Sequence, residues 1–263
     1  MTTRLCIVGL GGRMGREIAA AAVADSRVSV AGGTVRAGAL AGRSFAQVAG
    51  VSIGGARVSE SLAELLPDAD VVVDFTNPVT TLDTARVASE AGRALVIGTT
   101  GMTGDQIDAL RARAERVPIL YGRNMSVGVN ALAQFLPILA RALAGYDVEI
   151  IEAHHRFKKD APSGTALILA EAIVAALGKN LADVATYGRE GISPRREGEI
   201  GIHAIRAGGN AGEHTVIFAD EGEEIRVSHR ANSRRTFALG ALRAAAWIAQ
   251  QPPGFHSMAD LLH

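Results

Sequence analysis

Five basic side chains occupy six consecutive positions near the middle of the chain, and their types and spacing suit chemistry on an anion. They are His154, His155, Arg156, Lys158 and Lys159. Pro162-Ser163-Gly164-Thr165 follows, with the composition of a helix N-terminus, where N–H groups bind anions. The histidines titrate near neutral pH, and a lysine is a mobile cation that donates a proton when its pKa is lowered. The pattern predicts a site that holds a small dianion and transfers protons on it.

A metal site and a solvated charged loop are the other interpretations of this basic cluster. Adjacent residues on a strand point to opposite faces, so only one of His154 and His155 would reach a metal ion. The carboxylates near suitable spacing are only Glu152 and Asp160. We therefore predict no metal. A solvated loop would explain the charge, but the lysine, the titrating histidines and the donors that follow all suit an anion.

A glycine-rich loop near the start of the chain is the second chemical motif. It reads Gly9-Leu10-Gly11-Gly12-Arg13-Met14-Gly15-Arg16 and lies between an apolar run and an Ala-rich helical pattern. Strand, glycine loop and helix in this order are the setting of a dinucleotide fingerprint, although the spacing here is Gly9-x-x-Gly12-x-x-Gly15. Glycines let the backbone approach a pyrophosphate at the helix N-terminus. The alternative is a glycine-rich turn without a ligand.

The end of the second predicted strand bears on the choice of cofactor. NAD sites usually carry Asp or Glu there, to bind the ribose hydroxyls. This chain has Gly32-Gly33-Thr34-Val35-Arg36 and no carboxylate. Arg36 can bind a 2′-phosphate through a forked contact, with help from Arg13. We predict NADPH, with NADH as the alternative cofactor, unless Arg36 is only a solvated loop residue.

The elements that must position these motifs alternate between strands and helices up to about residue 121. Strands are expected at Leu5 to Val8, Val28 to Ala31, near Val58, at Val71 to Phe75, Leu95 to Ile97 and Ile119 to Tyr121. Helices are expected at Arg13 to Val23, Pro78 to Ala91 and, from the capping box Thr103-Gly-Asp-Gln106, to about Arg116. Apolar strands followed by helices predict a parallel sheet covered on both faces. Residues 37–55 are rich in glycine, and their pattern predicts no helix or strand.

The second half of the chain has a different pattern. Helices are expected at Val127 to Leu143 and Thr165 to Leu177, and a strand at Val148 to Ala153. Further strands, at Ile200 to Arg206, Glu213 to Ala219 and Glu224 to His229, are expected to be joined by hairpin turns and to pair mostly antiparallel. An amphipathic helix, Arg234 to Gln250, is expected to return to the first domain.

These elements predict an α/β protein with two domains. Residues 1–125 and 234–263 form a Rossmann-type dinucleotide-binding domain with a parallel sheet. Residues 126–233 form an α+β substrate-binding and oligomerisation domain with a mixed sheet.

The amino-acid composition argues against several classes of function. The 263 residues carry 27 Lys and Arg against 27 Asp and Glu, so neither nucleic acid nor membrane is an expected partner. The single cysteine, Cys6, lies in an apolar run and cannot form a disulfide within the chain, which fits a reducing compartment. No apolar stretch reaches membrane-spanning length and no signal-peptide pattern opens the chain. We expect a cytoplasmic protein.

The basic cluster, Glu152-Ala-His-His-Arg-Phe-Lys-Lys-Asp-Ala-Pro-Ser-Gly-Thr-Ala166, closely resembles the signature of the 4-hydroxy-tetrahydrodipicolinate reductase (dihydrodipicolinate reductase) family of the diaminopimelate route to lysine. Other segments resemble the family in order along essentially the whole chain. They are Gly9 to Arg16, Asp74-Phe75-Thr76, Gly98-Thr-Thr-Gly101, Asn124 to Asn130, Gly212-Glu-His214 and Ser233 to Phe237.

The resemblance implies a role for each matching residue. His154 matches the family's proton donor and acceptor, and Lys158 matches its second proton donor. Positions that hold the substrate carboxylates are matched by His155, Lys158, Ser163, Gly164 and Thr165. Cofactor contacts are matched by Gly9, Leu10, Gly11, Gly12, Arg13, Met14, Gly98, Thr99, Thr100, Gly122, Arg123, Asn124 and Met125, with Arg234 and Phe237 in addition. Arg36 matches the residue associated with the 2′-phosphate, but Val35 stands where the family often has an acidic residue.

The activity that the resemblance implies is NAD(P)H-dependent reduction of 4-hydroxy-2,3,4,5-tetrahydrodipicolinate to tetrahydrodipicolinate, with loss of water. The substrate is a cyclic imine with two carboxylates, and the expected assembly is a homotetramer. Two alternatives remain: another Rossmann oxidoreductase, such as an aspartate dehydrogenase, and a non-catalytic NADPH-sensing regulator. The basic cluster followed by Pro-Ser-Gly-Thr argues against the first, and a regulator would not need His154 together with Lys158.

Overall fold

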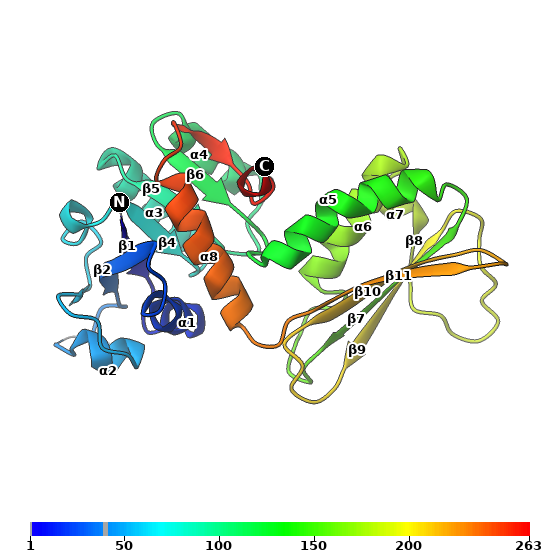
Figure 1. The fold of residues 1–263 in the computed structure, drawn as a ribbon, viewed down its shortest axis with the longest axis horizontal. Helices are drawn as coiled ribbons and strands as arrows, with labels where there is room; N and C mark the ends of the chain where they lie inside the picture. Colours follow the sequence, from blue (N-terminus) through cyan, green and yellow to red (C-terminus); the bar gives the residue numbers. More distant parts are fainter. Residues whose placement is uncertain (1, 39–41) are drawn as a thin grey trace. The chain divides into compact units, whose positions relative to one another are not determined.

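The computed structural model describes residues 2–38 and 42–263, which divide into two compact units (Figure 1). The first unit contains the chain up to Val127 and, after a long interruption, Arg234–His263. The second unit is Gly128–Ser233. The first unit is therefore discontinuous, because its last helix follows the whole of the second unit in sequence.

The first unit contains, in its described part, a seven-stranded sheet in the order β12-β6-β5-β4-β1-β2-β3. Its strands are β1 (Thr3–Val8), β2 (Val28–Thr34), β3 (Arg57–Ser59), β4 (Val71–Asp74), β5 (Ala94–Ile97), β6 (Pro118–Tyr121) and β12 (Gly254–His256). Every pairing is parallel. The strand order reverses between β1 and β4, and ligands of open α/β sheets bind at such a point. The Rossmann-type parallel sheet expected from the sequence is confirmed.

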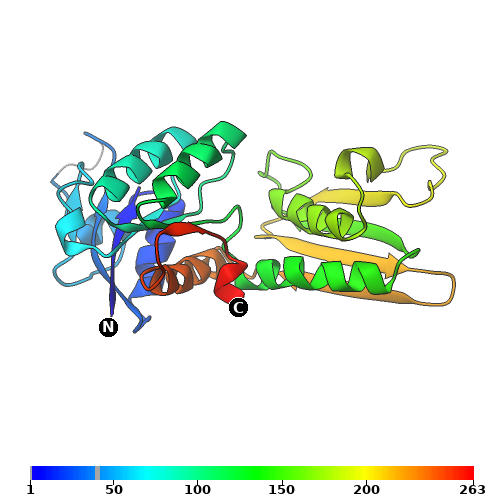
Figure 2. The same ribbon diagram turned by 90° about the horizontal axis from the view of Figure 1, so that it is seen from above.

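Helices cover both faces of this sheet. They are α1 (Arg13–Ala22), α2 (Phe45–Ala49), α3 (Pro78–Glu90), α4 (Gly104–Ala114), α8 (Arg235–Ile248) and the short 3-10 helices η1 (Leu66–Asp68) and η2 (Asp260–Leu262). Figure 2 shows α3 and α4, in cyan and green, on one side of the sheet and the orange-brown α8 on the other.

Alternate residues of β1 belong to the two different cores of this unit. Leu5 and Ile7 pack with α1 and α8, whereas Cys6 and Val8 pack with α3 and α4. Burial raises the pKa of the Cys6 thiol to about 12, so this residue is a core residue and not a nucleophile.

The second unit contains, among its described residues, a five-stranded sheet in the order β11-β10-β7-β9-β8. Its strands are β7 (Asp147–His154), β8 (Ala185–Tyr187), β9 (Ile200–Arg206), β10 (Glu213–Ala219) and β11 (Glu224–Arg230), and its helices are α5 (Val127–Ala142), α6 (Gly164–Ala176) and α7 (Leu181–Val184). Alternate residues of β7, such as Val148 and Ile150, are buried in a core formed with α5 and α6. The helices lie on one face of the sheet (Figure 1).

Two expectations about this sheet were wrong. Strands β9 and β10 do not form a hairpin, because β7 lies between them and pairs with both. The β7–β9 and β8–β9 pairs are parallel, so the mixed sheet predicted for this unit is confirmed, whereas the expectation that its strands pair mostly antiparallel is wrong. The loop after β9 crosses the end of β7, where the Ala207 N–H donates to the His154 carbonyl and the His155 N–H donates to the Asn210 carbonyl. These hydrogen bonds pair backbone N–H and carbonyl groups that a hairpin would otherwise have paired.

Candidate functional site: a buried imidazole network and a glycine-lined nucleotide pocket

Strand β7 ends at His154, and helix α6 begins ten residues later with Ser163 as its N-cap. The Ser163 side chain accepts a hydrogen bond from the Ala166 N–H at 3.1 Å, as expected of a cap. Ser163 is 1% exposed and His154 is 8% exposed. The first turn of α6 carries no acidic residue, and the N-terminus of a helix favours negative charge. This end of the second unit therefore has the polarity of an anion site.

The carboxylate of Glu152 connects these two residues. It is fully buried, and it accepts hydrogen bonds from the Ser163 N–H at 3.0 Å and from both terminal nitrogens of Arg206, at 2.8 and 2.6 Å. Its Oε2 also lies 2.6 Å from Nδ1 of His154. Burial opposes ionisation of Glu152, but the hydrogen bonds from Arg206 and His154 outweigh it and keep its pKa below the ordinary value.

These contacts define the tautomer of His154. An ionised carboxylate only accepts hydrogen bonds, so Nδ1 of His154 carries a proton and Nε2 is the atom that can exchange one. Burial lowers the pKa of His154, and the charge and hydrogen bond of Glu152 oppose that change. Gly212 leaves room beside Nε2, because a Cβ there would lie 3.0 Å from that nitrogen. A neutral imidazole with one accessible nitrogen is the resting state that this geometry supports.

A second histidine, His214 on β10, completes the network. Its Nε2 lies 2.9 Å from Oγ of Ser163, and its ring meets the His154 ring edge to face at 5.1 Å between centroids. Burial, followed by the nearby His154, lowers the pKa of His214 to about 3. His214 therefore remains neutral at physiological pH and orients the Ser163 hydroxyl without changing charge.

Lys158 is held by a partner that the sequence reasoning did not foresee. Its Nζ lies 2.9 and 2.8 Å from the two carboxylate oxygens of Asp160. The Asp160 carbonyl in turn accepts from Arg206 at 2.7 Å. His155 is partly exposed, and its ring lies 6.4 Å from that of Phe157. The connection from Lys158 to His154 thus runs through Asp160, Arg206 and Glu152.

Four residues of this network have no role in the prediction from sequence: Arg206, His214 and, except as possible metal ligands, Glu152 and Asp160. The signal for Glu152 was its spacing, because residues i and i+2 on a strand share a face and Glu152 is two positions before His154. Arg206 is opposite His154 in the β7–β9 register, which the sequence does not reveal.

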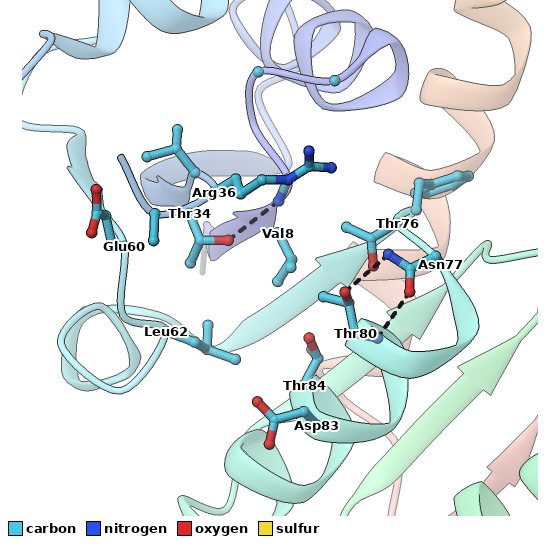
Figure 3. Close-up of a pocket in the computed structure, with 16 residues that line it drawn as sticks. Val8, Thr34, Arg36, Glu60, Leu62, Thr76, Asn77, Thr80, Asp83 and Thr84 are labelled. Carbon is cyan, nitrogen blue, oxygen red and sulfur yellow. Dashed lines mark hydrogen bonds between the residues drawn. The ribbon is translucent and has the colours of Figure 1, made fainter. Parts of the chain in front are cut away.

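The first unit contains a pocket of about 650 Å³ at the carboxyl ends of β1, β2 and β4. Its walls include Gly9, Gly11 and Gly12 of the glycine loop and residues 34–37 after β2. Figure 3 shows Thr34, Arg36 and Glu60 along one wall and Thr76, Asn77 and Thr80 along the other. All of these residues belong to the first unit.

The glycine loop fits a dinucleotide pyrophosphate. Gly9 has φ +73°, a conformation that favours glycine. A Cβ at Gly15 would lie 2.5 Å from the Gly9 carbonyl oxygen, so glycine at 15 lets α1 start close to the strand. Gly12 is the N-cap of α1 and no side chain caps the helix. The helix N-terminus therefore presents backbone N–H groups to the pocket, as anion binding requires.

The other residues expected to contact a cofactor are at the same edge of the sheet. Gly98, Thr99 and Thr100 follow β5, and Gly122, Arg123, Asn124 and Met125 follow β6. Arg234 is the N-cap of α8, and Phe237 in its first turn packs against the first core. Leu10 is fully buried, so its side chain serves the core. Of the expected cofactor residues, Gly9, Gly11, Gly12 and Arg36 line the described pocket.

The pocket also contains a carboxylate that sequence reasoning missed. Glu60, directly after β3, lines the same wall as Arg36. Its Oε1 accepts a hydrogen bond from the Gly38 N–H at 2.8 Å. No sequence motif indicates it, because Glu60 reaches this wall only through the parallel pairing of β3 with β2, which ends at Thr34 and Ser59.

Residues 2–38 and 42–263 contain neither a membrane-spanning helix nor a grouping of metal ligands. None of the helices in that part of the chain is long and apolar enough to cross a membrane. In the same ranges, no three His, Cys, Asp or Glu residues are grouped as a metal ion would require.

Known proteins resemble this chain over nearly its whole length. The model of the dihydrodipicolinate reductase N-terminus matches residues 3–125, and that of the C-terminus matches residues 128–262. A 4-hydroxy-tetrahydrodipicolinate reductase of Rubrobacter xylanophilus is 49% identical over 261 residues, 98% of this chain and 98% of that protein. One from Hahella chejuensis is 46% identical over 263 residues, 99% of this chain and 98% of the relative.

Solved structures share the fold at lower sequence identity. A dipicolinate-bound dihydrodipicolinate reductase from Paenisporosarcina sp. TG-14 superposes with a TM-score of 0.75 at 23% identity, covering 98% of each chain. An amine dehydrogenase from Mycobacterium smegmatis gives 0.67 at 14% identity, covering 98% of this chain and 96% of that one. The two family models and the relatives confirm the resemblance that the basic cluster first indicated: the chain belongs to the dihydrodipicolinate reductase family.

Proposed function

We propose that this chain catalyses the NAD(P)H-dependent reduction of 4-hydroxy-2,3,4,5-tetrahydrodipicolinate to tetrahydrodipicolinate, with loss of water, in diaminopimelate and lysine biosynthesis. The reaction consumes one hydride and one proton and releases one water. The observation that carries the proposal is the buried His154–Glu152–Ser163 network beside the N-terminus of α6. It joins a proton-exchanging imidazole to an anion site, which is what reduction of a dicarboxylate ring requires.

The cofactor proposed is NADPH, with NADH as a second one. When bound, it supplies the hydride. The backbone of Gly9 to Gly12 and the α1 N-terminus would hold its pyrophosphate, and Arg36 would bind the 2′-phosphate. In this proposal Arg13, Met14 and the loops after β5 and β6 would supply the remaining contacts.

The substrate's two carboxylates bind the second unit in this proposal. The first turn of α6, from Ser163 to Thr165, offers N–H and hydroxyl donors, and Lys158 with His155 offers positive charge. A bound dianion favours the protonated form of His154, whose pKa burial lowers in the free protein. His154 then donates a proton from Nε2 to the anionic centre that forms when the ring accepts the hydride, with Lys158 as second donor.

The proposal also covers assembly and location. We propose a homotetramer in the cytoplasm, where reducing conditions suit the single Cys6. The face of the second unit's sheet that its helices leave uncovered presents Ile205, 50% exposed, and, elsewhere on the same face, the partly exposed Ile151 and Ile217. Apolar residues on an open sheet face suit contact with another copy. Sedimentation equilibrium tests this: a monomer at micromolar concentration would contradict it.

A comparison of two substrates tests the activity. With NADPH, the chain should turn over enzymatically generated 4-hydroxy-tetrahydrodipicolinate and leave oxaloacetate with ammonia essentially unreacted. The aspartate dehydrogenase alternative predicts the reverse. A regulator predicts dinucleotide binding without oxidation of either mixture.

Replacing Arg36 by Ala should weaken NADPH binding about tenfold or more and change NADH binding little. The reason is that a forked, charge-assisted contact exists only with the 2′-phosphate. Titration of each dinucleotide, followed by nicotinamide fluorescence, measures this. Equal losses for both dinucleotides would remove Arg36 from phosphate recognition.

A further inference from the structure

Strand β3 places an acidic residue where the end of β2 has none. The two strands pair in parallel, with Gly33 opposite Val58 and Thr34 opposite Ser59. The Val35 N–H continues the ladder and donates to the Ser59 carbonyl at 3.0 Å. Glu60 is therefore level with Val35, the position where an NAD site carries its ribose-binding carboxylate.

The Glu60 carboxylate is fixed at the pocket wall rather than directed away from it. Oε1 accepts from the Gly38 N–H at 2.8 Å, which ties the carboxylate to the segment that begins with Arg36. Among the described residues, no donor contacts Oε2. Glu60 and Arg36 both line the pocket and lie along the same wall (Figure 3). An acceptor oxygen and a guanidinium thus face one ligand region.

We infer that Glu60 supplies, from β3, the carboxylate that NAD sites carry at the end of β2, and that the pocket uses it to bind NADH. The two hydroxyls of the adenosine ribose donate to this carboxylate in NADH. In NADPH the 2′-phosphate replaces one of those donors and is repelled by Glu60 while Arg36 attracts it. The balance of the two side chains sets the preference between the cofactors.

A purely structural role for Glu60 makes a different prediction. If the carboxylate served only to hold Gly38, its loss would weaken both dinucleotides by the same factor. Glu60→Gln separates the two roles, because the amide oxygen still accepts from the Gly38 N–H while the negative charge is removed. The inference rests on dinucleotide binding in the first unit, which the proposed function shares, and does not depend on the reaction.

The test is a titration of NADH and NADPH without substrate, on the full chain. Glu60→Gln should raise the ratio of the NADH to the NADPH dissociation constant at least about fivefold, because a charge-assisted contact to ribose is lost and a repulsion of phosphate is removed. Arg36→Ala should change the ratio in the opposite direction. Glu115→Gln, the same charge change at an exposed position at the end of α4, should leave the ratio unchanged.

The outcomes separate this inference from the proposed function. If the unaltered chain binds both dinucleotides and Glu60→Gln leaves their ratio unchanged, the inference is wrong and the proposed function stands. Parallel weakening of both dinucleotides by Glu60→Gln would also leave their ratio unchanged and would contradict the inference. If the unaltered chain binds neither dinucleotide, the proposed cofactor and the inference fall together.

Discussion

Replacement of His154 by Gln lowers kcat by about 10²- to 10⁴-fold and changes substrate affinity little, as expected when a positioned proton donor is lost. Glutamine can still hydrogen-bond to Glu152, so the buried carboxylate keeps a partner, but no atom remains that titrates near neutral pH. The measurement is steady-state NADPH oxidation at saturating substrate, with dipicolinate affinity determined separately by calorimetry.

A matched control is available in the same unit. His203 also faces a glutamate, with Nε2 2.7 Å from Oε2 of Glu149, but this pair is outside the His154–Glu152 network. His203→Gln should retain most of the turnover. Turnover of His154→Gln equal to that of the unaltered chain would remove His154 from the proton transfer.

Replacement of Glu152 by Gln should lower kcat at least about tenfold and move the alkaline limb of the kcat/KM profile to lower pH. The direction follows from the contributions to the His154 pKa. Burial lowers that pKa and Glu152 raises it, so without the carboxylate the pKa falls further. The protonated donor is then lost at a lower pH as the pH rises. A profile that stays in place, or moves to higher pH, would contradict this positioning role.

Stability must be followed in the same variant. Glu152 is fully buried and is the partner of Arg206, so its loss leaves a largely buried guanidinium without its carboxylate. Removing one member of a buried pair costs about 3–5 kcal/mol. Urea unfolding should show a loss of this order, and the kinetic profile should be recorded where circular dichroism shows the variant to be folded. A merely structural role would lower activity without moving the pH profile.

Local sequence patterns predicted much of the fold. Ile200 to Arg206 and Glu213 to Ala219 are strands with the predicted bounds, because alternation of period two and flanking turn residues are local signals. The strand–glycine loop–helix at the start was recognised for the same reason. Helix α2 carried a signal too, the capping box of Ser44 and Gln47, but its five residues are too few for a helical period to appear.

The order in which the strands pair could not be predicted from the sequence. The hairpin expected between β9 and β10 is wrong because β7, about 50 residues earlier, takes the place between them. Nothing in the turn residues Gly208-Gly209-Asn210 distinguishes a hairpin from a loop that crosses a third strand. Which of the two forms depends on β7. Its alternate apolar residues pack against α5 and α6, and this packing places β7 at the centre of the sheet.

The same limit applies to the candidate site. Residue types near one another in sequence, such as His154 and Lys158, indicated the chemistry. Arg206 and Glu60 could not be found this way, because each reaches its place through the register of a neighbouring strand. The residues that fix the charge and tautomer of the site are therefore brought there by the fold. From the sequence alone, only the residues whose protonation they control could be identified.

A crystal structure of the chain with dipicolinate and NADPH tests the central claim most directly. The account predicts the two ligand carboxylates at the first turn of α6 and near Lys158, with the ring against Nε2 of His154 and with Nδ1 still bonded to Glu152. Dipicolinate bound elsewhere, with the His154 imidazole directed away from it, would contradict the account even if the chain proved to be an active reductase.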